Sequence, residues 1–160
     1  MKNIKLLLPV ILLTLITACG SNSTEQHPNI SSASFVSYTS AKASNKVTKI
    51  DVKEQEMKII PASNSAPAGQ IDFVIKNVGR MPHEFVVFKT DLPLDKLPQK
   101  NGEMDENGAG VKNVADTGEK YLKSGETRTL RANLTPGKYV LVCNLPGHFS
   151  GGMKTAFVVK

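Results

Sequence analysis

The chain has 160 residues, of which 20 are Lys or Arg and 14 are Asp or Glu, giving a formal net charge of +6. Its lysines are scattered rather than gathered with aromatic residues in one stripe, which excludes nucleic-acid-binding proteins from the expected classes. With only 2 cysteines, a small domain held by several disulfides is excluded as well.

The first 18 residues are typical of a bacterial export signal. Lys2 and Lys5 precede an apolar run over residues 6–16, which is too short for a membrane span. The run ends in Leu15-Ile-Thr-Ala-Cys19, which resembles a lipobox, the motif whose cysteine becomes lipidated and N-terminal after cleavage. We expect a signal peptide over residues 1–18 and a lipid on Cys19. The alternative is an ordinary signal peptide cleaved near Ala18, with Cys19 incidental.

Residues 19–45 predict a flexible tether. They are rich in Ser, contain few large apolar residues and show no stable periodicity. We therefore expect one folded domain over residues 46–160, and about 115 residues are enough for a compact core. The protein is expected to be exported and lipid-anchored to the bacterial membrane, facing the periplasm or the cell exterior.

From residue 47 onward, apolar and polar residues alternate as in strands with one buried face. In residues 71–78, for example, Ile71, Phe73 and Ile75 share one face, and Asp72 and Lys76 share the other. The segments with strand character are residues 47–52, 57–60, 71–78, 84–88, 127–134, 138–143 and 154–159. Turn signals separate them without βαβ alternation, so we predict an all-β antiparallel sandwich of about seven or eight strands.

Residues 91–125 interrupt this pattern. They contain Pro93, Pro98 and several glycines, and residues 95–99 are the only candidate for a short helix. A long irregular insertion in a compact β domain usually packs over a face or a site. We expect this one to do the same.

The segment Cys143-Asn-Leu-Pro-Gly-His148-Phe-Ser-Gly-Gly-Met153 lies between the last two expected strands. It places a thiolate, an imidazole and a thioether at matched intervals. With a second imidazole, these donors make up a His₂Cys trigonal site with a weak axial Met, the geometry of blue copper electron transfer. The candidate second imidazole is His83, which follows a turn over residues 79–82. The remaining histidine, His27, lies in the tether.

Each donor also has an ordinary structural interpretation. Cys143 alone suits a buried core thiol, His83 a core histidine, and Met153 or Met81 a core side chain. However, a single thiol in an oxidising compartment has to be buried or held by a metal, because no disulfide partner remains once Cys19 carries lipid. Taken together, four donors of the correct types in the required order favour one copper ion per chain.

Other redox and hydrolytic sites fail on residue counts. A dinuclear copper site needs two cysteines in its loop, and a multicopper oxidase needs more than the 3 histidines present. The Cys-x-x-Cys-His motif for haem is absent, a structural zinc site would not use a weak Met, and no Ser-His-Asp spacing is evident. We therefore expect a carrier rather than an enzyme.

The spacing Cys143-x₄-His148-x₄-Met153 resembles the ligand loop of the cupredoxins, the type 1 blue copper proteins of the plastocyanin and azurin superfamily. Among them it is most similar to the auracyanin and rusticyanin groups. The resemblance covers residues 47–160 and implies a Greek-key sandwich with copper bound by His83, Cys143 and His148, with Met153 axial. One position departs from it: many cupredoxins have Asn after the first His, where it helps to tie the two ligand loops together, and this chain has Glu84.

The leading functional hypothesis is a single-electron carrier of the cell envelope that exchanges electrons with cytochrome or oxidase-type partners as a monomer. Its electron exit is expected at His148, within an apolar docking patch of Leu145, Pro146 and Phe149. The alternative is an envelope copper protein for delivery, storage or resistance. Such proteins more often use exposed Met-rich or His-rich tracts, and this chain has none.

Overall fold

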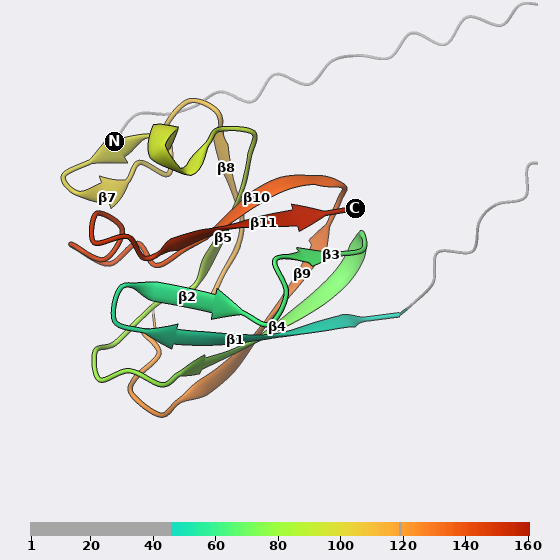
Figure 1. The fold of residues 1–160 in the computed structure, drawn as a ribbon, viewed down its shortest axis with the longest axis horizontal. Helices are drawn as coiled ribbons and strands as arrows, with labels where there is room; N and C mark the ends of the chain where they lie inside the picture. The colour runs from blue at the N-terminus through green and yellow to red at the C-terminus, as the bar shows by residue number, and fades with distance from the viewer. Residues whose placement is uncertain (1–45, 119) are drawn as a thin grey trace, which may run out of the picture. The chain divides into compact units, whose positions relative to one another are not determined.

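The computed structural model describes residues 46–118 and 120–160 (Figure 1). The predicted signal peptide, the lipidated Cys19 and the tether lie outside these residues and stay predictions. In the part of the chain that the structure describes, no helix is long and apolar enough to cross a membrane.

Two β-sheets form the domain. The first has four strands in the order β2-β1-β4-β9. Their bounds are Thr48–Gln55 for β1, Lys58–Pro61 for β2, Gly69–Asn77 for β4 and Thr127–Leu134 for β9. β1 runs parallel to β4, with Val52 opposite Ile75, and the other neighbours are antiparallel.

The second sheet has five strands in the order β3-β11-β10-β5-β8. Their bounds are Ser65–Ala66 for β3, Val86–Thr90 for β5, Val111–Asp116 for β8, Gly137–Val142 for β10 and Lys154–Val159 for β11. The β3–β11 pair is parallel. The chain changes sheet at β2–β3, β3–β4, β4–β5, β8–β9 and β9–β10, and such repeated crossing between the sheets is typical of a Greek-key sandwich.

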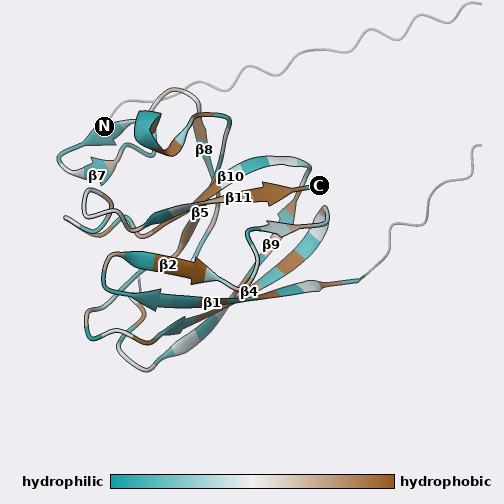
Figure 2. Ribbon diagram, in the orientation of Figure 1, coloured by the Kyte–Doolittle hydropathy of each residue, from teal (hydrophilic) through white to brown (hydrophobic). Residues whose placement is uncertain are grey.

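The main core lies between the two sheets. Figure 2 shows hydrophobic and hydrophilic bands alternating along β4, and Ile71, Phe73 and Ile75 are fully buried on its inner face. The Phe73 ring lies 5.4 Å from the ring of Phe157 on β11 and 5.4 Å from that of Phe85. These aromatic contacts join the two sheets near their centre.

A second, smaller core covers the outer face of the second sheet. Phe88, Val140 and Phe149 pack there against Leu97 and Met104. The last two residues belong to the segment that contains the 3₁₀ turn Leu94–Lys96 and the hairpin of β6 (Gln99–Lys100) and β7 (Glu103–Met104). The expectation that the insertion packs over a face is thus confirmed.

The predicted all-β sandwich is confirmed, and each of the seven predicted strands is present within a few residues. Two details were wrong. The sheets are mixed rather than purely antiparallel, because β1–β4 and β3–β11 are parallel pairs. The insertion is also not irregular throughout, because it contains β8. This strand pairs with β5 in the second sheet, with Asp116 opposite Val86. The helical turn of the insertion ends at Lys96, before most of the predicted 95–99 segment.

Phe73→Ala should lower the free energy of unfolding by about 3–5 kcal/mol, because it removes a buried ring and leaves a cavity between the sheets. The measurement is denaturant unfolding of the metal-free protein. The matched control is Val158→Ala on β11, whose side chain is 40% exposed, with an expected change within about 0.5 kcal/mol. Equal effects of the two changes would contradict the assigned core.

Candidate metal centre

Three metal-binding side chains meet at one end of the sandwich. His83 lies between β4 and β5, Cys143 directly follows β10, and His148 lies between β10 and β11. All three are buried. The two Nδ1 atoms are 3.3 Å apart, and Cys143 Sγ lies 3.3 Å from Nδ1 of His148 and 3.9 Å from Nδ1 of His83. Across residues 46–118 and 120–160, this is the only cluster of His, Cys, Asp or Glu that could hold a metal ion.

The positions of these three atoms fit a metal ion. A point equidistant from the two Nδ1 atoms and Sγ lies about 2 Å from each of them, close to the lengths of transition-metal bonds to imidazole nitrogen and thiolate sulfur. One soft thiolate with two imidazoles suits copper in a trigonal site. The donor set therefore fits one type 1 copper ion.

Met153 lies beside this cluster. Its side chain is fully buried in the same core as Cys143. The Cys143 amide donates to the Met153 carbonyl at 3.1 Å, and the Met153 amide donates to the His148 carbonyl at 3.0 Å. These bonds close the base of the loop and bring Met153 next to the other donors. Its role as the axial ligand stays a prediction, as does the ligand role of the other three residues.

Internal hydrogen bonds hold the loop between Cys143 and Met153 in one conformation. The His148 amide donates to the Leu145 carbonyl at 2.9 Å, and the Gly151 amide donates to the Gly147 carbonyl at 2.9 Å. Gly147 and Gly152 have φ of 81° and 99°, a left-handed backbone that favours glycine. The sequence 143–153 therefore specifies a tight turn that carries His148 back toward Cys143.

The expected docking patch was partly wrong. Phe149 is fully buried and packs into the outer core of the second sheet, and Leu145 is only 7% exposed. The amine of Lys154 lies 4.2 Å from the centre of the Phe149 ring. Phe149 therefore anchors the loop instead of facing a partner, and of the three expected patch residues Pro146 alone is exposed.

Backbone and amide hydrogen bonds fix the segment of His83. Its amide donates to the Leu122 carbonyl at 3.0 Å, and the Leu122 amide donates back to the His83 carbonyl at 2.6 Å. The buried amide of Asn77 donates to the carbonyls of Met81 at 2.7 Å and Leu122 at 2.8 Å, and it accepts from the Gly79 amide at 2.9 Å. Asn77 thus joins both segments that flank His83.

Glu84 links the two ligand segments. Its amide donates to Cys143 Sγ at 3.4 Å, and its carboxylate accepts from the Asn144 amide at 2.9 Å. The Asn144 side chain in turn accepts from the Met104 amide at 2.7 Å and donates to the Met104 carbonyl at 3.1 Å. Glu84 therefore makes the connection between loops that the resemblance assigned to Asn, and the β6–β7 hairpin braces the loop.

Burial keeps the donors neutral in the absence of a metal. It raises the pKa of the Cys143 thiol to about 12, although the Glu84 amide opposes this shift. Burial also lowers the pKa of both His83 and His148, and the neighbouring imidazole of His148 lowers that of His83 further. Neutral imidazoles are ready to bind a metal, whereas the thiol has to release its proton when a metal enters.

Two buried polar residues near this centre, Glu54 and Asn77, were not predicted from the sequence. Glu54 is fully buried, and neither carboxylate oxygen has a hydrogen-bond partner among the described residues. Burial, followed by the charge of Glu84, raises the pKa of Glu54 to about 8. A signal was present, because Glu54 is in phase with the core residues Ile50 and Val52 of β1. Asn77 likewise follows Ile75 on the inner face of β4.

Comparison with known proteins places this site in context. A model of the sulfocyanin (SoxE) domain matches residues 16–160. A search of curated protein sequences finds no significant match.

Several solved structures share the fold. An auracyanin from the photosynthetic bacterium Roseiflexus castenholzii is 23% identical with a TM-score of 0.52, over 71% of this chain and 97% of that one. Rusticyanin from Thiobacillus ferrooxidans is 21% identical with a TM-score of 0.51, over 73% of this chain and 79% of that one. Auracyanin A from Chloroflexus aurantiacus, a "blue" copper protein, is 18% identical with a TM-score of 0.50, over 72% and 100%.

Asn77→Ala should lower the free energy of unfolding by about 2–4 kcal/mol, because it leaves the Gly79 amide and the Met81 carbonyl without their partner and takes one of two donors from the buried Leu122 carbonyl. Thermal or denaturant unfolding of the metal-free protein measures this. Asn133→Ala, at an exposed position of β9, is the control and should change little. If Asn77→Ala lowered the free energy of unfolding no more than Asn133→Ala does, Asn77 would not be what holds the Met81 and Leu122 segments together.

Glu54→Gln should change how stability depends on pH. The folded state holds the Glu54 proton up to about pH 8, whereas the unfolded state releases it near its ordinary pKa. The protonated Glu54 carboxyl group therefore contributes its full stabilisation of the fold at pH values below the pKa of the unfolded state. As the pH rises from that pKa to the pKa of the folded state, this stabilisation falls by on the order of 1 kcal/mol per pH unit.

Unfolding free energies of the metal-free wild type and Glu54→Gln, measured from pH 4 to pH 9, test this. The difference between them should shift steadily in favour of Glu54→Gln up to about pH 8 and then level off. Asp91→Asn, which removes an exposed carboxylate, is the control. A constant difference between wild type and Glu54→Gln would show that Glu54 is ionised in the fold.

Proposed function

Because the chain belongs to the sulfocyanin (SoxE) domain family of the cupredoxins, we propose that it is a single-electron carrier with one type 1 copper ion. His83, Cys143 and His148 are the proposed trigonal ligands, with Met153 axial. The observation that carries the proposal is the meeting of Sγ and two Nδ1 atoms, at separations of 3.3–3.9 Å, inside a buried end of the sandwich. The "blue" copper protein among the structures of similar fold supports the choice of metal.

Copper bound by these donors supplies a one-electron Cu(I)/Cu(II) couple. The protein's contribution is to keep the donors in place in both oxidation states. The β-bridge to Leu122 fixes His83, the Glu84 amide orients the Cys143 sulfur, and the Cys143–Met153 backbone bond closes the loop. Because few groups have to move, the reorganisation that accompanies electron transfer is small.

His148 is the proposed edge for electron exchange. It is 4% exposed, whereas His83 and Cys143 are not exposed at all. The neighbouring Pro146 is exposed, so a partner that contacts this part of the loop comes close to the His148 ring. The proposed partners are cytochrome or oxidase-type redox proteins, met by a monomer in weak, transient encounters.

The proposed location is the cell envelope. The basic residues, apolar run and Cys19 motif of the first 19 residues support export followed by lipidation. A lipid on Cys19 and the Ser-rich segment after it would attach the copper domain to the membrane on the periplasmic or external side.

The protein loaded with Cu(II) should absorb visible light intensely through thiolate-to-copper charge transfer, and it should cycle reversibly by one electron. Cys143→Ser should abolish this absorption, because a hydroxyl cannot replace the soft, charged thiolate. Absorption spectroscopy and a redox titration measure both properties.

The matched control is His27→Ala, which removes the histidine outside the folded domain and should leave the spectrum unchanged. Colour retained by Cys143→Ser would overturn the ligand assignment. Colourless Cu(I) binding with rapid release by the unmodified protein would instead indicate copper delivery or storage.

A further inference from the structure

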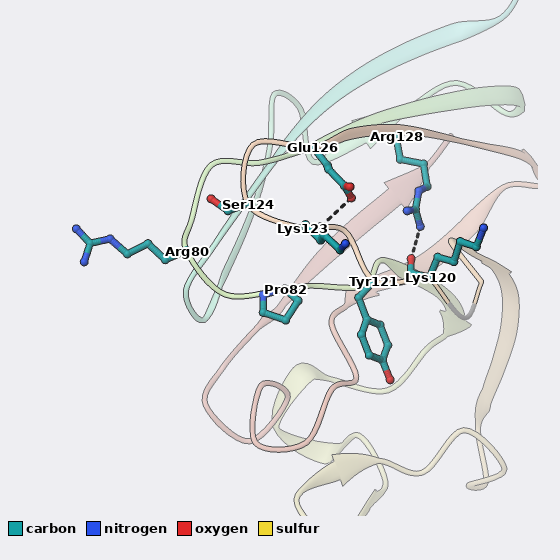
Figure 3. A pocket seen from close by; sticks show the side chains of 8 residues that line it. All are labelled: Arg80, Pro82, Lys120, Tyr121, Lys123, Ser124, Glu126 and Arg128. Carbon is teal, nitrogen blue, oxygen red and sulfur yellow. Dashed lines mark hydrogen bonds between the residues drawn. The ribbon is translucent and has the colours of Figure 1, made fainter.

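A basic surface hollow of about 750 Å³ lies beside the segment of His83. Four of its lining side chains are cationic: Arg80, Lys120, Lys123 and Arg128. Figure 3 shows Lys123, Pro82 and Tyr121 in the middle of the lining, Lys120 and Arg128 on one side, and Arg80 on the other side with its side chain extended away from them. Tyr121 is 50% exposed, so the hollow combines positive charge with an accessible aromatic ring.

Little negative charge lies in the lining itself. Acidic residues stand next to it: Glu56 accepts hydrogen bonds from the amides of Arg80 and Met81, and Glu84, Glu106 and Asp116 line a neighbouring hollow that shares Tyr121. Within residues 46–118 and 120–160, the ion pairs are Lys49–Asp51, Lys96–Asp95 and Arg131–Asp72, and none involves the hollow. Its one lining acid, Glu126, accepts a hydrogen bond from the Lys123 amide at 2.9 Å (Figure 3). Glu119 lies outside the described residues. The lining therefore carries four positive charges against one negative charge.

Three of the cations differ in how firmly they are held. The Arg128 guanidinium donates to the carbonyls of Thr117 and Lys120, which hold it in the wall without neutralising its charge (Figure 3). The side chains of Lys120 and Lys123 are exposed. A fixed positive charge flanked by adaptable ammonium groups suits carboxylates on an incoming surface.

The hollow is directly connected to a proposed copper ligand. Pro82 precedes His83 in the chain, and Leu122, between Tyr121 and Lys123, exchanges two backbone hydrogen bonds with His83. A partner seated in the hollow therefore contacts Pro82, which is covalently bonded to His83, and Tyr121 and Lys123, which are connected to His83 through Leu122.

We propose that this hollow is the docking site for an acidic patch on the redox partner, with partner carboxylates received by Lys120, Lys123 and Arg128 and an apolar contact made by Tyr121. The proposal rests on the proposed electron-carrier function. The hollow is too open and too wide to fit one small anion closely, and its recessed Arg128 suits a protruding protein surface better than a flat membrane. Docking makes and breaks no covalent bond; it seats the partner beside the segment of His83, whose ring centre lies 5.1 Å from that of His148, the proposed edge for electron exchange.

An octaglutamate peptide is a probe for this site, titrated into the isotope-labelled, metal-free full chain and followed by nuclear magnetic resonance. Shifts are expected in Arg80 and residues 120–128. The double variant Lys120→Glu/Lys123→Glu should weaken binding by about tenfold or more, because it replaces attraction by repulsion. Binding to the unmodified chain should also weaken steeply with added salt.

The matched control is Lys112→Glu/Lys138→Glu, which changes the net charge equally at two exposed positions. Lys112 pairs with Lys89, which lies opposite Tyr139, so both control residues lie at the end of the second sheet away from His83. The control should bind octaglutamate within about twofold of wild type. Because the readout needs no copper, failure of the electron-carrier proposal and failure of the docking site are separable.

Three outcomes would overturn the docking site. Equal weakening by both double variants would show a general effect of net charge. Shifts mapped to other surfaces would place peptide binding elsewhere. Binding to anionic phosphatidylglycerol vesicles, sensitive to Lys120→Glu/Lys123→Glu, without binding of octaglutamate would assign the hollow to the membrane instead.

Discussion

The rest of the structure depends on bringing one thiol and two imidazoles together in a buried site. Their ligand atoms face one another at 3.3–3.9 Å, and buried polar groups at such separations are stable only when the surrounding backbone fixes them. The β10 strand delivers Cys143, the loop turns His148 back toward it, and the bridge to Leu122 presents His83 from the other segment. The two sheets are thus coupled at the same end as the metal centre.

The charges around the centre oppose a free thiolate and favour a cation. Burial raises the pKa of Cys143, and the nearby carboxyl groups of Glu54 and Glu84 raise it further. A bound copper ion would compensate the negative charge of the Cys143 thiolate, which burial and these carboxyl groups disfavour. At the same time, the Glu84 amide donates to the sulfur, so one residue contributes both an orienting hydrogen bond and an acidic side chain.

The insertion between β5 and β9 serves the centre as well as the fold. Its β8 strand completes the second sheet, and its β6–β7 hairpin covers the outer face at Leu97 and Met104. Asn144, next to Cys143, is bonded to Met104 in both directions. The insertion therefore contributes to positioning the ligand loop, and the residues at its end line the basic hollow together with Arg80, Pro82 and Arg128 of β9.

The sequence by itself determined the local features of this protein. Alternation predicted strands such as β4, because one face of the first sheet is buried, whereas β5 and β10, which are covered on both faces, form apolar runs. The spacing from Cys143 to Met153, with the glycines between, predicted the loop and its donors. The sequence could not determine which strands pair. β1 joins β4 in parallel because the first sheet buries Ile50 and Val52 beside Phe73 and Ile75, which is a contact between distant segments. The short strands β3, β6 and β7 were missed because two residues show no periodicity.

Tertiary structure alone decided what surrounds the donors. The carboxylate of Glu84 meets the Asn144 amide, 60 positions along the chain, and the amide of Asn77 meets the Leu122 carbonyl, 45 positions along the chain. No local pattern marks such pairs. Phe149 illustrates the same limit: beside His148 it was expected on the surface, yet the insertion provides an apolar face that buries it. Local sequence fixes which atoms can bind a metal, and long-range packing fixes where they meet and what charges they experience.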